Sequence, residues 1–317
     1  MAAGAGSDVA DAAVPGLLTP SRAGTDDRVT DTRTHRIPLD DAVIGVREYH
    51  APSSGASIVF LPALGVPIGY YEPLFQAWAR HVIGVEWRGM PESRVDDLRR
   101  ARFGYSDLIR GDLPAAVRLA RALGAPDVVL VGHSLGGQIA LLAAAGGTVR
   151  PAAVVAIATG TSAALHLPAH RRWQRRLGVA VVGGVSRAAG HWPGHLLRFG
   201  GRQPRSMMRD WAYEARHGRY HLAGDPTDYE AALSDSRVPS LLLALDGDRM
   251  VPPAAVAHLA RRVGGPAEQI TVPAGASGGF DHFTWARRSP RAIIKPVEAW
   301  LKQASGPVAQ GGGQPAA

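Results

Sequence analysis

Short apolar runs alternate with segments of helical periodicity along most of this 317-residue chain, and this alternation limits the possible folds more than any other feature. A continuous apolar run between turn residues is typical of a strand buried on both faces of a sheet. Strands are predicted at residues 57–61, 81–87, 127–131, 152–158, 240–245 and 269–272. Helices are predicted at about 70–80, 106–123, 138–145, 252–263 and 291–303. This order predicts an α/β fold, with a mainly parallel sheet and helices on both faces.

One large domain with an insertion accounts for the whole pattern. Two short strands at 35–39 and 42–49 are joined by a turn and begin an antiparallel edge. Residues 160–235 interrupt the rhythm of strand and helix, and we interpret them as a helical lid inserted over one end of the sheet. The expected organisation is a disordered leader over 1–32, the domain over 33–304 with its lid at about 160–235, and a disordered tail over 305–317.

The pattern Gly-x-Ser-x-Gly occurs twice, around Ser134 and around Ser277. A nucleophile elbow places its serine on a tight turn between a buried strand and a helix, and only Ser134 has both neighbours. Gly132 and Gly136 keep side chains out of that turn. The helix that starts at Leu135 directs its N-terminal amides toward the position where an oxyanion would form. Ser134 is therefore the predicted nucleophile.

A serine hydroxyl needs a base to take its proton, and the base needs a carboxylate to fix its orientation. In chains with such an elbow, the acid comes after the serine in the sequence, and the histidine comes after the acid. The strand at 240–245 runs into a turn with two carboxylates, Asp246 and Asp248. We expect Asp248 to be the acid, because the turn would direct its side chain back toward the nucleophile. Asp246 stays open as the alternative, with bonding to turn amides as its other role.

Of the twelve histidines, His258 and His282 follow the acid. His258 falls inside a predicted helix, whereas His282 lies in a loop that begins with glycines and continues with aromatic residues. His282 is therefore the predicted base. Two backbone amides would form the oxyanion hole: that of Leu135 after the serine, and that of Leu64 in the loop after the 57–61 strand, with Ala63 as the alternative to Leu64.

Composition removes several other chemistries. The chain has no cysteine, which excludes disulfides, iron–sulfur clusters, Cys-ligated metals and a Cys nucleophile. Three histidine pairs have the spacing of two ligands on one helix face, but two of them enclose a proline and none has the glutamate of a zinc protease motif. These pairs are His166 and His170, His191 and His195, and His217 and His221. We expect neither a metal nor a cofactor.

The charge pattern and the apolar runs bear on partners and location. The net charge of +8 is spread along the chain without a recognisable nucleic-acid module, so nucleic acid is not an expected partner. No apolar run reaches the ~18 residues that span a bilayer, and the first thirty residues do not read as a signal peptide. We expect a soluble, cytoplasmic protein whose partner is a small-molecule acyl substrate. The oligomeric state is left open.

The composition of the predicted lid bears on the substrate. Residues 160–235 carry eleven arginines against six acids, together with Trp173, Trp192 and Trp211. Apolar rings and positive charge predict a substrate with an apolar acyl chain and a negative charge.

These features resemble the α/β-hydrolase superfamily over about residues 36–303, and the elbow and the acid and histidine loops are the specific parts of the resemblance. Four further segments are similar to a bacterial group described as predicted or uncharacterised α/β hydrolases, which has no settled substrate. They lie at residues 62–66, 87–90, 103–108 and 199–204. Members of that group often carry glycine before the histidine, where this chain has Asp281.

The resemblance implies an α/β-hydrolase fold and hydrolysis of an ester or related acyl substrate through an acyl-enzyme. Ser134 would attack, His282 would transfer the proton, and Asp248 would orient His282. A serine at the elbow, in place of aspartate, disfavours haloalkane dehalogenase and epoxide hydrolase chemistry. Acyl transfer under a water-excluding lid is the alternative enzyme class. A non-catalytic binding protein on the same fold is the third interpretation.

Overall fold

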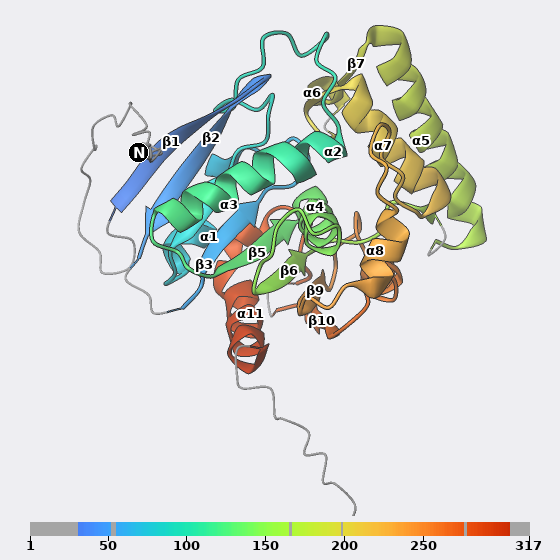
Figure 1. The fold of residues 1–317 in the computed structure, drawn as a ribbon. Helices are drawn as coiled ribbons and strands as arrows, with labels where there is room; N and C mark the ends of the chain where they lie inside the picture. The colour runs from blue at the N-terminus through green and yellow to red at the C-terminus, as the bar shows by residue number, and fades with distance from the viewer. Residues whose placement is uncertain (1–30, 52–54, 165–166, 198, 276–277, 305–317) are drawn as a thin grey trace, which may run out of the picture.

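An eight-stranded sheet lies at the centre of the computed structural model, which describes residues 31–51, 55–164, 167–197, 199–275 and 278–304 (Figure 1). Its strand order is β1-β2-β4-β3-β5-β6-β9-β10. The β1–β2 and β2–β4 pairs are antiparallel, and all the other neighbours are parallel. The predicted α/β architecture is confirmed. The strands of the sheet are β1 (Asp31–Leu39), β2 (Ala42–His50), β3 (Ser57–Leu61), β4 (Val82–Val85), β5 (Val128–His133), β6 (Ala153–Ile157), β9 (Ser240–Leu245) and β10 (Ala267–Val272).

Helices cover both faces of the sheet, and alternate side chains of a central strand enter different cores. On β9, Leu242 and Ala244 pack on the α4 and α9 side, whereas Leu241, Leu243 and Leu245 pack on the α1 and α11 side. The helices are η1 (Ile68–Tyr71), α1 (Glu72–Ala77), α2 (Tyr105–Asp107), η2 (Leu108–Asp112), α3 (Leu113–Ala122), α4 (Leu135–Ala145), α5 (Ala169–Ala189), α6 (Gly194–Leu197), α7 (Arg205–His217), α8 (Tyr229–Asp235), α9 (Pro253–Ala260), α10 (Trp285–Arg288) and α11 (Pro290–Ala304). No helix in the described ranges combines the length and the apolar character needed to cross a membrane.

The helix predicted over 70–80 is shorter in the structure, because tertiary contacts end it. Trp78 has an extended backbone, and its indole N–H donates to Glu298 of α11 at 2.7 Å. Arg80 donates to the same carboxylate at 2.6 and 2.8 Å. These bonds draw the chain away from the helical path before β4.

The helix predicted over 106–123 is divided by one π-helical turn, η2, between α2 and α3. Pro114 lies in the first turn of α3. Proline has no N–H to give to the carbonyl four residues earlier, and a wider turn before it accommodates that loss. In α11, Pro296 lies inside the helix.

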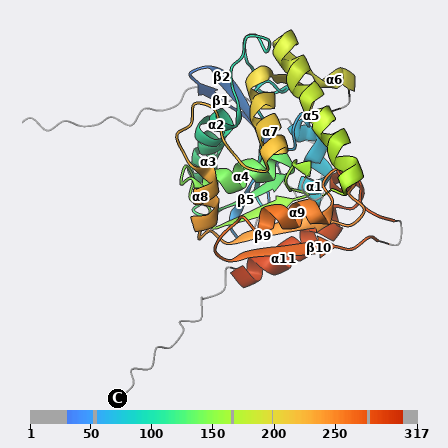
Figure 2. The same cartoon turned by 90° about the vertical axis from the view of Figure 1, so that its right-hand side faces the viewer.

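The segment over residues 160–235 contains α5 and α7, which lie side by side beyond the sheet (Figures 1 and 2). A separate hairpin of β7 (His191–Pro193) and β8 (Arg202–Pro204) was not expected from the sequence. Buried Asp210 of α7 anchors the segment to the rest of the domain by accepting from the Tyr105 N–H at 3.1 Å, and Glu214 joins α7 to the start of the segment by accepting from the Ser162 N–H at 2.8 Å. The last helix of the segment, α8, packs against α4.

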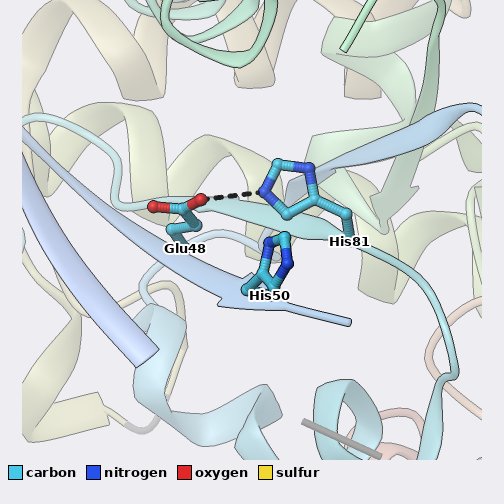
Figure 3. Close-up of side chains that lie close together, drawn as sticks. All are labelled: Glu48, His50 and His81. Atoms are coloured by element: carbon cyan, nitrogen blue, oxygen red, sulfur yellow. Dashed lines mark hydrogen bonds and ion pairs between the residues drawn. The ribbon is translucent and has the colours of Figure 1, made fainter. Parts of the chain in front are cut away.

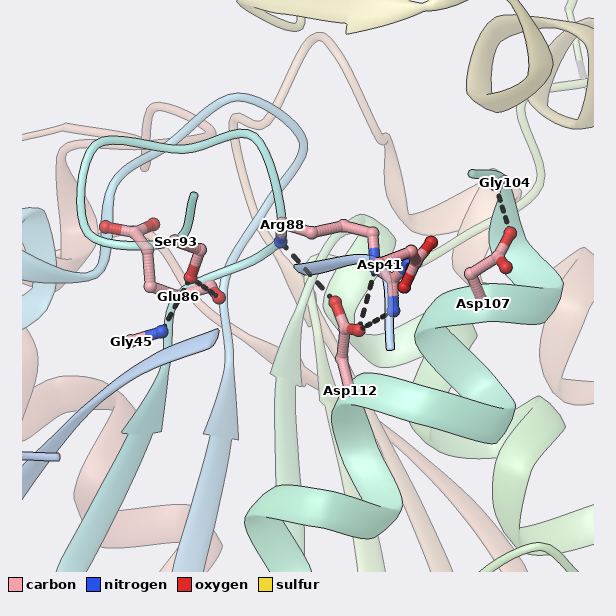
Figure 4. A network of polar contacts seen from close by, with 8 residues as sticks. All are labelled: Asp41, Gly45, Glu86, Arg88, Ser93, Gly104, Asp107 and Asp112. Atoms are coloured by element: carbon pink, nitrogen blue, oxygen red, sulfur yellow. Dashed lines mark hydrogen bonds and ion pairs between the residues drawn. The ribbon is translucent and has the colours of Figure 1, made fainter. Parts of the chain in front are cut away.

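A buried ion pair fixes the chain after β4 (Figure 4). The Arg88 guanidinium donates to Asp112 of η2 at 2.6 Å and to Asp41, in the turn between β1 and β2, at 2.8 Å. Arg88 and Asp112 are both almost fully buried. These contacts join three distant parts of the chain. Removing either Arg88 or Asp112 would destabilise the fold, because it would leave the other charge buried without a partner.

A second group of contacts holds the loop that follows β4 (Figure 4). The Ser93 hydroxyl donates to the Glu86 carbonyl at 2.6 Å and accepts from the Gly45 N–H of β2 at 2.8 Å. Farther along, Asp107 accepts from the Gly104 N–H at 2.7 Å. The loop therefore reaches α2 with a fixed path, and the first residue of α2, Tyr105, lies in the wall of the cavity described below.

Candidate active site

Ser134 lies on a sharp turn between β5 and α4. Its φ of 53° and ψ of −114° are strained for a residue with a side chain. A Cβ atom at Gly132 would lie 2.3 Å from the backbone of Gly136, and one at Gly136 would lie 2.1 Å from the Leu61 carbonyl oxygen. The Ser134 N–H donates to the Ile157 carbonyl of β6 at 3.0 Å. The two glycines let the helix approach the strand, and the neighbouring strand holds the turn.

Asp248 and His282 are in direct contact in the buried part of the site. Asp248 Oδ2 lies 2.7 Å from His282 Nδ1, and both residues are only 3% exposed. The other carboxylate oxygen, Oδ1, accepts from the Met250 N–H at 2.8 Å and from the Val251 N–H at 2.9 Å. These two bonds fix the carboxylate so that it orients the His282 ring.

The other two carboxylates near His282 are exposed and bond to the backbone. Asp246 Oδ2 accepts from the Ala274 N–H at 3.3 Å. Asp281 Oδ1 accepts from the N–H groups of Phe283 and Thr284, at 3.0 and 3.2 Å, just before α10. Asp281 therefore acts on the local chain and makes no bond to the His282 ring.

Four of the five predicted site residues line one small cavity of about 70 Å³: Leu64, Ser134, Leu135 and His282. The fifth, Asp248, lies behind the His282 ring. In the described part of the chain, no hydrogen bond joins the Ser134 hydroxyl to His282; such bonds often form only when substrate is bound. Ser277, in the second Gly-x-Ser-x-Gly pattern, lies outside the described residues.

The backbone amides around the cavity differ in their partners. The Ala63 N–H donates to the Tyr71 hydroxyl at 3.0 Å. Within the ranges that the structure describes, the amides of Leu64 and Leu135 have no acceptor. This difference favours Leu64 over Ala63 as the second donor to an oxyanion.

Sequence reasoning missed the contact between Tyr71 and His133. The Tyr71 hydroxyl lies 2.7 Å from His133 Nδ1 and accepts from Ala63, so its own proton points to the His133 ring. Burial lowers the pKa of His133 far below its usual value, so the ring is neutral. It packs beside His282, with ring centroids 4.8 Å apart. His133 directly precedes Ser134 in the sequence, but no sequence signal identifies Tyr71 as the partner of His133.

Two of the three histidine pairs considered as metal ligands do not share a helix face. His191 lies in β7 and His195 in α6, while His217 ends α7 and His221 lies beyond it. His166 lies outside the described residues, so the pair with His170 is not described.

Within the described residues, Glu48, His50 and His81 bring their potential ligand atoms within 4.8 Å of one another (Figure 3). They lie beside the amino end of β4, far from the carboxyl end of β5 that leads to Ser134. The Glu48 carboxylate already bonds to His35 at 2.8 Å and to His81 at 3.1 Å. Two imidazoles satisfy the buried carboxylate, and we assign no ion to the cluster.

The cluster predicts a pH-dependent contribution to stability. The bonds from His35 and then from His81 hold the pKa of Glu48 well below its ordinary value of 4.5. A lowered pKa in the folded state contributes stability above the unfolded pKa, and this stability is lost as the pH falls below about 4.5. Glu48→Gln should lower the free energy of unfolding at pH 7 by roughly 1–3 kcal/mol. Urea unfolding at pH 7 and pH 3 should show that the loss of unfolding free energy in Glu48→Gln is smaller at pH 3.

The control for this experiment is Glu72→Gln, which removes a half-buried carboxylate from the first turn of α1, where its only ion-pair contact in the described residues is with Arg47 at 3.9 Å. It should change the free energy of unfolding by less than about 0.5 kcal/mol at either pH. A Glu48→Gln loss of the same size at pH 7 and pH 3 would mean that the charge of Glu48 does not stabilise the fold.

Comparisons with known proteins agree with this fold. The sequence pattern of the alpha/beta hydrolase family matches residues 58–295. The fold resembles alpha/beta hydrolase domain-containing protein 10 from mouse, with 17% identity and a TM-score of 0.56 over 86% of this chain and 100% of that one. It also resembles the haloalkane dehalogenase DatA from Agrobacterium tumefaciens C58, with 18% identity and a TM-score of 0.59 over 86% of this chain and 97% of that one. A thermophilic esterase from Thermogutta terrifontis is similar as well, with 17% identity and a TM-score of 0.55 over 86% of this chain and 99% of that one. No curated protein matches the chain.

Proposed function

We propose that this chain, which belongs to the alpha/beta hydrolase family, is a serine hydrolase that cleaves an ester or related acyl substrate through an acyl-enzyme on Ser134. The observation that carries the proposal is the 2.7 Å contact between Asp248 and His282, with His282 and Ser134 on one cavity. An imidazole that donates from Nδ1 to a carboxylate keeps Nε2 free to accept a proton.

The proposed first step acylates the serine. His282 Nε2 takes the Ser134 proton while Oγ bonds to the substrate carbonyl carbon, and the carbonyl oxygen becomes an oxyanion. The amides of Leu64 and Leu135 would donate to this oxygen. His282 then gives its proton to the leaving alcohol as the carbonyl re-forms, which leaves an ester on Ser134.

The second step regenerates the enzyme. A water gives a proton to His282 and adds to the acyl carbon, and the carboxylic acid leaves as the proton returns to Ser134. Buried Asp248 would stabilise the imidazolium in both steps. We also propose that residues 160–235 act as a lid, because Arg175 and Trp211 of this segment line the cavity with Ser134.

Labelling with a fluorophosphonate probe tests the proposed function, because the probe reacts only with activated serines. The protein should be labelled once, on the peptide that contains Ser134, and should hydrolyse p-nitrophenyl esters in a chain-length series. Haloalkanes serve as the negative control, since some proteins of this fold are dehalogenases. Halide release without labelling would overturn the proposal, and alcohol-dependent formation of a new ester would instead indicate acyl transfer.

A further inference from the structure

Arg175 of α5 places a positive charge in the wall of the proposed catalytic cavity. Its side chain lines the same space as Ser134 and His282. It also lines an adjoining groove of about 540 Å³ beneath α5, where Trp192 and Leu197 form part of the wall. Arg175 therefore lies where the small cavity meets the larger groove.

The Arg175 guanidinium has no acidic partner in the described part of the chain. Its Nε donates to the Ser162 carbonyl at 3.0 Å, and no carboxylate oxygen of the described residues forms an ion pair with it. Glu214 is the acid that influences it, but Glu214 already bonds to Thr161 and to the Ser162 N–H. The Trp211 ring, 6.0 Å away, adds only a cation–π contact.

Other arginines that lie partly or wholly within the fold are paired, in contrast to Arg175. Arg80 pairs with Glu298, and Arg88 pairs with Asp112. Burial lowers the pKa of Arg175, since removing the cation from water carries a cost that the nearby Glu214 offsets only in part. A bound anion would offset that cost.

The other charged residues that line the groove are also positive. Arg171 and Arg249 line it together with Arg175, and its lining contains neither aspartate nor glutamate. Most of the other lining residues are apolar. Of the three lid tryptophans singled out in the sequence, Trp192 and Trp211 line the groove, whereas Trp173 is 60% exposed. Apolar walls with arginines fit a hydrocarbon chain that carries a carboxylate, which arginine can bind through two parallel hydrogen bonds.

We infer that Arg175 binds a carboxylate of the substrate and that the preferred substrates are esters bearing an anionic group. This inference rests on the proposed function, since the anion and the acyl carbon that Ser134 attacks would belong to one substrate bound in the cavity that Arg175 and Ser134 both line. Arg175 would act by binding and positioning the substrate and would take no part in proton transfer.

The test compares two esters with the same six-carbon acyl chain, mono-p-nitrophenyl adipate and p-nitrophenyl hexanoate. The wild type should prefer the adipate ester in kcat/KM. Arg175→Gln should lower kcat/KM for the adipate ester by about 10- to 100-fold, the effect of losing a charged hydrogen bond, and change it less than about threefold for hexanoate. Arg175→Lys keeps the charge but loses the planar guanidinium, so its kcat/KM for the adipate ester should lie between those of the wild type and Arg175→Gln.

Arg176→Gln is the matched control, because Arg176 is the exposed neighbour on α5 and lines neither space. Arg176→Gln should leave kcat/KM unchanged for both esters. Free adipate provides a readout that does not need turnover: calorimetry should show binding to the wild type that weakens about tenfold or more in Arg175→Gln. Thermal melting of each variant establishes that it is folded.

The outcomes separate the two proposals. Fluorophosphonate labelling with equal kcat/KM for both esters, or an equal loss for both in Arg175→Gln, would overturn the role of Arg175 and keep the hydrolase. Arg175-dependent adipate binding without labelling would keep the anion site and overturn the hydrolase.

Discussion

Ser134→Ala should abolish fluorophosphonate labelling and lower kcat for ester hydrolysis by about 10⁴-fold or more, because the substitution removes only the attacking oxygen. The fold should persist. The Ser134 backbone bond to Ile157 is kept, and alanine carries the same strain at positive φ as serine. Labelling by mass spectrometry, ester kinetics and thermal melting measure the three expectations.

The control is Ser277→Ala, in the second Gly-x-Ser-x-Gly pattern. It should retain labelling and activity, since Ser277 does not lie between a buried strand and a helix in the sequence. Labelling that survives Ser134→Ala and disappears in Ser277→Ala would transfer the nucleophile to Ser277.

Asp248→Asn should yield a folded protein whose kcat falls steeply, by ~10⁴ as in well-studied triads. Asparagine keeps an oxygen that can accept from Met250 and Val251. Its amide nitrogen would face His282 Nδ1 in place of Oδ2 and donate to it, which favours a proton on Nε2, where the ring must accept one. The imidazolium would also lose the adjacent negative charge.

Asp246→Asn provides the matched comparison two residues away. Asp246 is exposed and bonds to the Ala274 amide, so its loss should cost about 1 kcal/mol of stability and leave most of the activity. Steady-state kinetics and urea unfolding distinguish the two variants. The reverse pattern would make Asp246 the acid, and a loss below about tenfold in both would contradict a Ser-Asp-His triad.

The sequence predicted best those elements whose environment is uniform. The predicted limits of β3 and β9 agree with the structure, because both strands are buried on both faces and bounded by turn residues. It predicted least well the elements that distant contacts define. The end of α1 depends on Glu298, more than 200 residues away, and the three-residue strands β7 and β8 have too few residues to show a period.

The same division applies to the candidate site. Ser134, Asp248 and His282 could be selected because each lies in a loop or turn after a predicted strand, where a motif or chain order identifies it. Tyr71 could not, since its role depends on Ala63 and His133 meeting in space. Arg175 is one of eleven arginines in its segment, and only the folded chain distinguishes it as lining the cavity without an acidic partner.

The proposed reacting groups follow β5, β9 and β10, whereas Arg175 and Trp211 belong to the inserted segment between β6 and β9. Separate stretches of the gene would thus encode the residues that break the bond and the residues that select the substrate. Mutations could accumulate in the inserted stretch and redirect the enzyme to a new ester while the machinery that breaks the bond stayed untouched. Grafting this stretch from one relative to another would then be a practical route to exchanging their substrates.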